Sequence, residues 1–211
     1  MKVMLVDDHA VVRMGFKLLL QACDDIEVVA EADSGEVACQ IFEAVAPDVV
    51  VMDIAMPGMG GIEAIKRLLA KDANARILAL SAHEDTSHPK RALQAGALGY
   101  LSKRSAPEVL IDAIRTIAKR QHYLDAQIAQ RIAVQDIHGD KAPIDKLSAR
   151  EFEVFIQLAR GQSVAQISET LKLSSSTVGT HLYNIKQKLG LINQAEMTLL
   201  AVRHGLIDVT G

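Results

Sequence analysis

Residues 48–61 read Asp-Val-Val-Val-Met-Asp-Ile-Ala-Met-Pro-Gly-Met-Gly-Gly, and this stretch decides how the rest of the chain can fold. Its apolar residues 49–52 have the length and composition of a short strand that is buried on both faces of a parallel sheet. Asp53 follows the strand, and a Pro/Gly loop runs from Pro57 to Gly61. Ligands of open α/β sheets bind outside the carboxyl ends of the strands, so Asp53 stands where such a fold does its chemistry. The structural alternative is a helix cap or a buried acid with satisfied hydrogen bonds.

The flanking sequence repeats this pattern and predicts a doubly wound parallel sheet over residues 1–120. Four further apolar runs predict strands at 3–6, 26–30, 76–81 and 97–102. Helical periodicity between the strands predicts helices over 11–20, 34–44, 62–69 and 105–120, the last opened by a capping box at Ser105 and Glu108. The helix after the fourth strand should begin late, near Ser87 or His88 with 84–86 irregular, because Pro89 fits only a first helical turn. Five strands that alternate with helices indicate a parallel α/β sheet.

After residue 120 the pattern changes to a linker and then to helices alone. Residues 121–146 predict a linker with a possible short helix at 126–134, followed by a polar stretch with turn signals. Capping boxes at Ser148–Glu151 and Ser163–Gln166 open two helices, and Ser174 caps a third that ends near Gly190. A fourth helix covers about 194–204. Residues 147–211 therefore predict an all-α four-helix domain that contains a helix-turn-helix.

The composition limits the classes of protein that the chain can be. The net charge of −3 provides no global basic field for nucleic acid, although residues 144–211 carry seven basic against six acidic side chains. Cys23, Cys39 and the seven histidines show no metal-ligand spacing, which favours a reduced compartment. No apolar run approaches the roughly 18 residues of a membrane span, and no signal peptide is recognisable. We therefore expect a soluble, cytoplasmic protein.

Side chains suited to phosphoryl chemistry stand at the ends of four predicted strands. The carboxyl ends of parallel strands meet along one sheet edge, which gathers the following residues: Asp7, Asp8, Asp53, Ser81 and Lys103. Three carboxylates this close cannot all stay ionised cheaply unless a cation neutralises them, and hard oxygen ligands suit Mg²⁺. A carboxylate held in this way can attack a phosphoryl group and form an aspartyl phosphate. Mg²⁺ and Lys103 would balance the charge of the transferring group, and Ser81 would offer it a hydroxyl.

This pattern resembles the receiver domain of bacterial two-component response regulators, which has a flavodoxin-like sheet, over residues 1–120. The resemblance implies a role for each strand-end residue: Asp53 as the phosphoacceptor, Asp7 and Asp8 with Asp53 as the magnesium site, Ser81 as the switch hydroxyl, Lys103 as the phosphate-contacting lysine and Tyr100 as the switch aromatic. Tyr100 is as well explained as a strand residue that is half-buried against a helix.

The third C-terminal helix combines an apolar stripe with a polar face. Val178, Leu182, Ile185 and Leu189 stand at i, i+4, i+7 and i+11, which is the spacing of a core-facing stripe. Such a polar face is more often simply solvated, but the pattern from Leu147 to Gly190 resembles the four-helix DNA-binding domain of NarL/FixJ (LuxR-type) regulators over residues 145–208. The resemblance implies that this is the recognition helix and that its DNA contacts are Ser176, Thr177, Gly179, Thr180, His181, Tyr183, Asn184, Lys186 and Lys188.

Gly179 and Tyr183 depart from the pattern of that family. The family often has lysine where Gly179 stands, and a base-contacting basic residue where Tyr183 stands. Glycine inside a helix costs about 0.5–1 kcal/mol relative to alanine, and fewer basic groups weaken the salt-dependent contact with phosphates. Either Gly179 permits close backbone approach while Thr180 and Tyr183 read bases, or DNA affinity is low and needs a dimer. We favour altered specificity, because the rest of the pattern is complete.

The two resemblances together imply a phosphorylation-dependent, DNA-binding transcription regulator. It would not be an enzyme, apart from magnesium-dependent self-phosphorylation and autodephosphorylation at Asp53. Its partners would be a sensor histidine kinase, double-stranded DNA and, once phosphorylated, a second copy of the chain, with no membrane involved. The implied self-association surface is the last helix, with Met197, Leu199, Leu200 and Val202.

Two other functions remain open from the sequence. The first is a phosphatase with an aspartyl nucleophile, which would leave the C-terminal helices unexplained. The second is a regulator whose helix-turn-helix acts mainly through protein–protein contacts, for which Gly179 and the near-neutral C-terminal region are the reasons.

Overall fold

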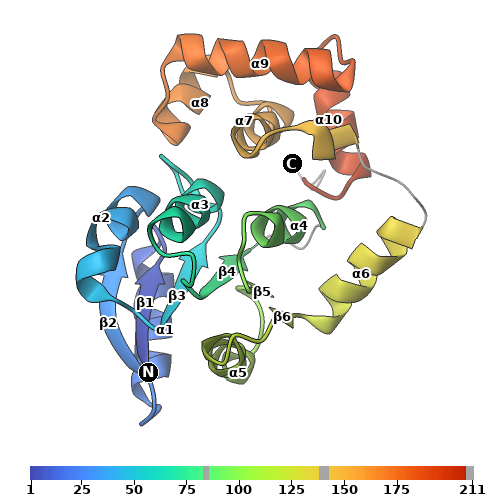
Figure 1. Cartoon of the computed structure of the whole chain (residues 1–211). Helices are drawn as coiled ribbons and strands as arrows, with labels where there is room; N and C mark the ends of the chain where they lie inside the picture. Colours follow the sequence, from blue (N-terminus) through green and yellow to red (C-terminus); the bar gives the residue numbers. More distant parts are fainter. Residues whose placement is uncertain (83–85, 138–142, 208–211) are drawn as a thin grey trace. The chain divides into compact units, whose positions relative to one another are not determined.

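The chain forms two compact units, Met1–Gln130 and Arg131–Gly211, each with its own hydrophobic core. The structure is a computed structural model that describes residues 1–82, 86–137 and 143–207 (Figure 1). Helix α6 (Ala126–Ile137) contains the boundary between the units. Within the described ranges, every helix is too short or too polar to span a lipid bilayer.

The N-terminal unit contains a parallel sheet with the strand order β2-β1-β3-β4-β5-β6. Its strands are β1 (Lys2–Val6), β2 (Glu27–Ala32), β3 (Val49–Asp53), β4 (Ile77–Ser81), β5 (Gly99–Ser102) and β6 (Tyr123–Leu124). The five strands expected from the sequence and their doubly wound arrangement are confirmed. The two-residue strand β6 was not expected. It lies in the stretch interpreted as a linker and pairs with Gly99 and Tyr100 at the edge of the sheet.

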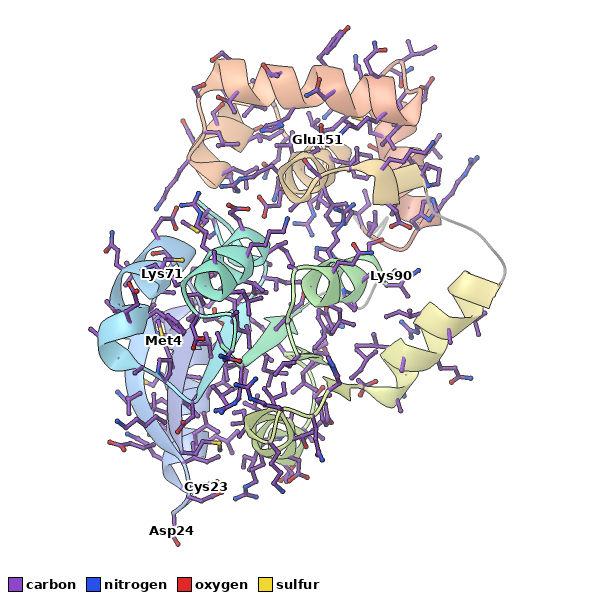
Figure 2. The ribbon with its side chains drawn as sticks, viewed as in Figure 1. Met4, Cys23, Asp24, Lys71, Lys90 and Glu151 are labelled. Atoms are coloured by element: carbon purple, nitrogen blue, oxygen red, sulfur yellow. The ribbon has the colours of Figure 1, made fainter. Side chains whose placement is uncertain are left out.

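Helices cover both faces of this sheet, so that its central strands are buried on both sides (Figure 1). On one face lie α1 (Ala10–Gln21) and α5 (Pro107–Ala118), and on the other lie α2 (Gly35–Val45), α3 (Gly61–Lys71) and α4 (Ser87–Gln94). Side chains alternate along a strand, so Val3 and Leu5 of β1 pack in the core beneath α1 and α5. Met4 stands between Val3 and Leu5 in the sequence and is also fully buried (Figure 2).

Proline geometry sets the starts of two helices of this unit, α4 and α5. Helix α4 begins at Ser87, which confirms the late start expected from Pro89; residues 84 and 85 lie outside the described residues. The capping box expected at Ser105 and Glu108 is wrong. The N-cap is Ala106, which makes no side-chain cap hydrogen bond. The residue before a proline is disfavoured in the helical region, and Ala106 is extended with ψ 147°, so α5 cannot begin before Pro107.

The C-terminal unit is entirely helical in its described part. A short 3-10 helix η1 (Pro143–Lys146) precedes α7 (Ala149–Ala159), α8 (Val164–Leu171), α9 (Ser175–Leu189) and α10 (Gln194–Arg203). Both predicted capping boxes are present, and the Ser174 side chain caps α9 by accepting a hydrogen bond from the Thr177 N–H. Phe152 and Phe155 of α7 form the centre of a core to which α9 and α10 contribute Val178 and Met197.

Gly61 is the position in the N-terminal unit where a side chain would meet the backbone most closely. A Cβ at Gly61 would lie 2.1 Å from the Asp53 carbonyl oxygen and 2.5 Å from the Ile54 Cα. These are main-chain atoms, so no side chain can give way. We expect Gly61→Ala to lower the free energy of unfolding by about 3 kcal/mol, measured by urea unfolding followed by circular dichroism.

Gly15 in α1 is the matched control for this substitution. A Cβ there meets no heavy atom within 4 Å, so Gly15→Ala should raise the free energy of unfolding by about 0.5–1 kcal/mol. A Gly61→Ala protein as stable as the wild type would contradict the packing of the loop against β3.

Candidate functional site

The strand-end residues expected to do chemistry meet at one edge of the sheet. Asp53 ends β3 and Ser81 ends β4, while Asp7 and Lys103 directly follow β1 and β5. Lys103 Nζ lies 2.7 Å from Asp53 Oδ2 and 2.6 Å from Asp7 Oδ2. Asp53 is only 1% exposed, and Asp7 and Ser81 are buried as well. Asp8 follows Asp7 at the same edge and is partly buried. The structure therefore brings all five residues to one sheet edge.

Burial and ion pairing set the charge states in this pocket. Burial raises the pKa of Asp53 above its ordinary value, and the nearby Lys103 ammonium offsets only part of that rise. Burial by itself would lower the pKa of Lys103, but its interactions with Asp53 and Asp7 outweigh burial, and the pKa lies above its ordinary value. Lys103 is therefore charged at neutral pH. One ammonium faces three carboxylates, so negative charge remains in excess.

The acidic residues fit a divalent cation. Asp7, Asp8, His9 and Asp53 each offer one ligand atom, and these atoms lie within 4.8 Å of one another. Asp7 Oδ2 and Asp8 Oδ1 are buried, and their close neighbours are the charged Lys103 Nζ at 2.6 Å and the His9 ring Nδ1 at 2.9 Å. Carboxylate oxygens with free lone pairs are the ligands that Mg²⁺ prefers.

Two residues near the pocket were missed from the sequence. His9 was given no role because histidine spacing showed no metal motif, yet its ring lies beside both acids that follow β1. Its place directly after Asp8 was the available signal. Glu36 of α2 accepts a hydrogen bond from the Met59 N–H at 2.7 Å and so holds the loop that follows Asp53. That contact joins residues 23 apart, and no local pattern reveals it.

The position of Asp53 itself is fixed from its own loop. Asp53 Oδ1 accepts a hydrogen bond from the Ala55 N–H at 2.9 Å, while Oδ2 faces Lys103. The two carboxylate oxygens therefore have different partners. Tyr100 on β5 is 0% exposed, so the alternative that it is half-buried is wrong.

In the C-terminal unit, α9 has the two faces that the sequence predicted. Val178 and Ile185 are fully buried, and Leu182 and Leu189 pack against the same core. The residues expected to contact DNA are exposed or partly exposed: Ser176, Thr177, Gly179, Thr180, His181, Tyr183, Asn184, Lys186 and Lys188. Tyr183 is the most prominent apolar group among them, with 64% of its surface exposed.

Several of these side chains already have partners inside the protein. The Thr180 hydroxyl donates to the Ser176 carbonyl oxygen at 3.0 Å, and the Thr177 hydroxyl lies 2.8 Å from that of Ser174. Lys188 Nζ lies 2.5 Å from Glu151 Oε2, in an ion pair with a buried carboxylate. Lys188 is therefore engaged within the domain, which the sequence did not reveal.

The structure also bears on Gly179 and on the last helix. A Cβ at Gly179 would meet no heavy atom within 4 Å, so packing inside the domain does not require glycine there. Met197, expected in a self-association surface on α10, is fully buried in the domain core together with Ala201. That expectation is wrong for Met197, because positions i and i+4 of α10 face α7. Leu199 is 57% exposed and remains available.

A doubly wound sheet with an acidic pocket, followed by a helix-turn-helix unit, defines a two-domain signalling regulator. Residues 3–115 match the family model of the response regulator receiver domain. Residues 145–201 match the model of bacterial regulatory proteins of the luxR family. The chain belongs to the two-component response regulators of the NarL/FixJ type, in which a receiver domain precedes a LuxR-type DNA-binding domain.

Relatives match this chain over nearly its whole length. Response regulator UvrY of Escherichia coli K12 is 41% identical over 208 residues, which cover 98% of this chain and 95% of the relative. Response regulator GacA of Pseudomonas aeruginosa PAO1 is 39% identical over 209 residues, with 98% of both chains covered. The crystal structure of a LuxR-family two-component response regulator from Aurantimonas sp. SI85-9A1 is 39% identical with a TM-score of 0.62, covering 64% of this chain and 97% of that one.

The raised pKa of Asp53 predicts how this residue affects stability. A raised pKa means that the folded protein holds the proton more tightly than the unfolded chain, so ionised Asp53 costs stability above the folded pKa. We expect Asp53→Asn to raise the unfolding midpoint in metal-free buffer at neutral pH. This advantage should shrink as the pH falls through the folded pKa of Asp53 and vanish below the unfolded value of 3.8.

In Mg²⁺, the wild type should become more stable than Asp53→Asn. At about 100 times its dissociation constant, an ion that binds only the folded state adds roughly 2.7 kcal/mol of stability, and Asp53→Asn should lose much of this gain. Asp24→Asn is the control, because Asp24 is exposed at the tip of the unit, away from the pocket (Figure 2). Thermal unfolding with and without Mg²⁺ measures both effects. An unchanged wild-type midpoint in Mg²⁺ would count against the metal site.

Proposed function

We propose that this response regulator is switched by phosphorylation of Asp53 and acts as a DNA-binding transcription regulator. The observation that carries the proposal is the Lys103 ammonium shared by Asp53 and Asp7 within an acidic pocket. Asp53 Oδ2 is the nucleophile: it forms a bond to phosphorus while the bond between phosphorus and the donor breaks, and the donor keeps the electron pair. The Ala55 N–H holds the other carboxylate oxygen in place during this step.

The charges of the pocket suit the transferred group. The Lys103 ammonium balances the phosphoryl oxygens, which carry the charge in the transition state. A magnesium ion held by Asp7, Asp8 and Asp53 would supply further positive charge there. Ser81, at the end of the neighbouring strand β4, offers its hydroxyl to a phosphoryl oxygen. We expect a sensor histidine kinase or a small phosphodonor to provide the phosphoryl group.

The proposed signal is a change in the balance between two states of the receiver domain. A phosphoryl group on Asp53 competes with Asp7 for Lys103 and attracts Ser81. Ser81 and Tyr100 lie on the adjacent strands β4 and β5, which pair in parallel register, and both are buried. A shift of Ser81 therefore changes the space available to Tyr100 and to α4, which packs on the same two strands.

The proposed output is binding of duplex DNA by α9. Its exposed polar face supports this role, and two copies bound to half-sites would mirror a two-fold symmetric dimer. We propose that phosphorylation promotes the dimer and that Leu199 of α10 lies in its interface. We propose a receiver domain over 1–120 and a DNA-binding domain over 147–211; within the connection 121–146, β6 joins the receiver sheet and α6 contains the boundary between the two units.

Two rival functions remain testable. An aspartyl phosphatase would use the same pocket, but it leaves the helix-turn-helix unit without a purpose; we propose no enzymatic activity beyond self-phosphorylation and autodephosphorylation. A helix-turn-helix that binds protein is favoured by Gly179 and by the engagement of Lys188, which together reduce the positive charge available on α9. The prediction of a cytoplasmic location is retained, supported by the two free cysteines.

The phosphorylation switch predicts a change in DNA affinity. In a gel-shift titration with pooled genomic fragments, Mg²⁺ and acetyl phosphate should lower the protein concentration needed for a shift by about 5- to 150-fold. Asp53→Ala should abolish the response to acetyl phosphate but keep the basal affinity, whereas the exposed Asp24→Asn control should respond as the wild type does.

Each contrary outcome identifies a rival. Binding that ignores acetyl phosphate would contradict the switch and leave a DNA-binding protein. Repeated turnover of a phosphate ester would favour the phosphatase. Absence of any shift would favour protein–protein contacts. If Gly179→Ala weakens binding although it fits the free space around it, glycine is needed for close approach to DNA.

A further inference from the structure

Glu151 is a buried acid outside the receiver pocket, and it connects two helices of the C-terminal unit. It is 4% exposed and lies in the first turn of α7, on the side that faces α9 (Figure 2). Its Oε2 accepts a hydrogen bond from the Ser148 N–H at 2.7 Å, which completes the capping box. The same oxygen receives Lys188 Nζ at 2.5 Å from the last turn of α9, 37 residues further along the chain.

The charge on Glu151 makes this contact more than a surface ion pair. Burial by itself would raise the pKa of Glu151, but hydrogen bonds from Lys188 and Ser148 outweigh burial and hold the pKa below its ordinary value. The carboxylate is therefore ionised at neutral pH. The Glu151 side chain is 5% exposed and that of Lys188 is 41% exposed, so only the carboxylate end of the pair is buried. Removing Lys188 leaves this buried carboxylate without its counterion, at a cost that solvent around the lysine reduces but does not remove. Lys188 therefore cannot turn towards a DNA phosphate without leaving the buried Glu151 carboxylate unpaired.

Lys186 stands in contrast to Lys188. It lies two residues earlier on α9, about 200° away around the helix. Among the residues that the structure describes, Lys186 forms no ion pair, whereas Lys188 is paired with Glu151. A lysine free of internal partners can neutralise a phosphate and release counterions without breaking a contact inside the protein.

We propose that Lys188 is a positioning residue, which fixes the C-terminal end of the recognition helix on α7 through Glu151, and that the phosphate contact at this end of α9 is made by Lys186. The inference rests on the proposed DNA-binding function and revises it, because Lys188 no longer counts among the DNA contacts. Without the ion pair, apolar packing such as that of Ile185 and Leu189 still holds the end of α9, but the helix loses the polar contact that fixes its angle relative to α7.

Contacts at the other end of α7 indicate that this helix is the scaffold of the domain. At its C-terminal end, the Leu158 and Ala159 carbonyl oxygens accept hydrogen bonds from Gln194 Nε2 at 2.7 Å and Thr198 Oγ1 at 2.8 Å. These bonds attach α10 to α7. The first turn of α7 therefore holds the helix proposed to read DNA, and its last turn holds the helix proposed to form the dimer.

The salt dependence of DNA binding separates a positioning residue from a phosphate contact. The full-length chain is titrated against a random-sequence DNA duplex by fluorescence anisotropy over a series of salt concentrations. We expect Lys186→Met to reduce the slope of log K against log salt by about 0.9 and to leave the melting midpoint unchanged. Lys188→Met should keep the wild-type slope, weaken binding at every salt concentration and lower the melting midpoint. Lys188→Arg, which can still pair with Glu151, should restore both.

Glu151→Gln provides the reciprocal test. Glutamine keeps an acceptor for the Ser148 N–H but removes the charge, so this variant should weaken DNA binding and melting as Lys188→Met does. The double variant should lose less than the sum of the two single losses, because both remove the same ion pair. Additive losses would overturn the proposal.

The remaining outcomes are equally decisive. A reduced salt slope in Lys188→Met, or tighter DNA binding by Glu151→Gln, would show that Lys188 contacts phosphate and would overturn the proposal. If the wild type binds no duplex in either phosphorylation state, the proposed DNA-binding function fails. The melting midpoints of the single and double variants would then still decide whether Lys188 and Glu151 hold the helix.

Discussion

The Lys103 ammonium, which pairs with both Asp53 and Asp7, is the interaction on which the receiver unit depends. Lys103 follows β5, and to reach β3 and β1 it must cross the end of β4, so the pairing requires the strand order of the sheet. One cation cannot balance three carboxylates. The remaining negative charge makes the pocket costly when empty of cations and receptive to a divalent ion. The same imbalance allows a phosphoryl group on Asp53 to redistribute the contacts of Lys103 and Ser81.

The C-terminal unit also contains a buried carboxylate paired with a lysine, but there the pair has a structural role. Glu151 is also buried and also pairs with a lysine from a distant element, but it has one lysine to itself and a capping-box N–H in addition. Its charge is fully compensated, so the contact is suited to hold helices in place. The negative charge of the receiver pocket is only partly balanced, so the pocket is suited to respond to a cation or a phosphoryl group. The ratio of carboxylates to cations thus separates a reactive site from a structural one within a single chain.

The sequence predicted the parts that depend on local signals. Apolar runs located the five long strands, and caps such as Ser148 and Ser174 located the starts of helices, because both act over a few residues. The strand-end residues could be placed together because parallel strands share one edge. The failures came from other causes. Two-residue β6 has no periodicity, Ala106 yielded to the proline after it, and Lys188 meets a partner 37 residues away. Met197 was misplaced because the two faces of α10 are similar in hydrophobicity.

We propose above all that Asp53 accepts a phosphoryl group in a cation-dependent pocket. The most direct test is the intact mass of the protein after incubation with acetyl phosphate, with and without Mg²⁺, followed by reduction of the acyl phosphate with borohydride and peptide mapping. We predict one phosphoryl group per chain, only with Mg²⁺, mapped to Asp53 and absent from Asp53→Asn. Modification at another residue, or equal modification of Asp53→Asn, would contradict it.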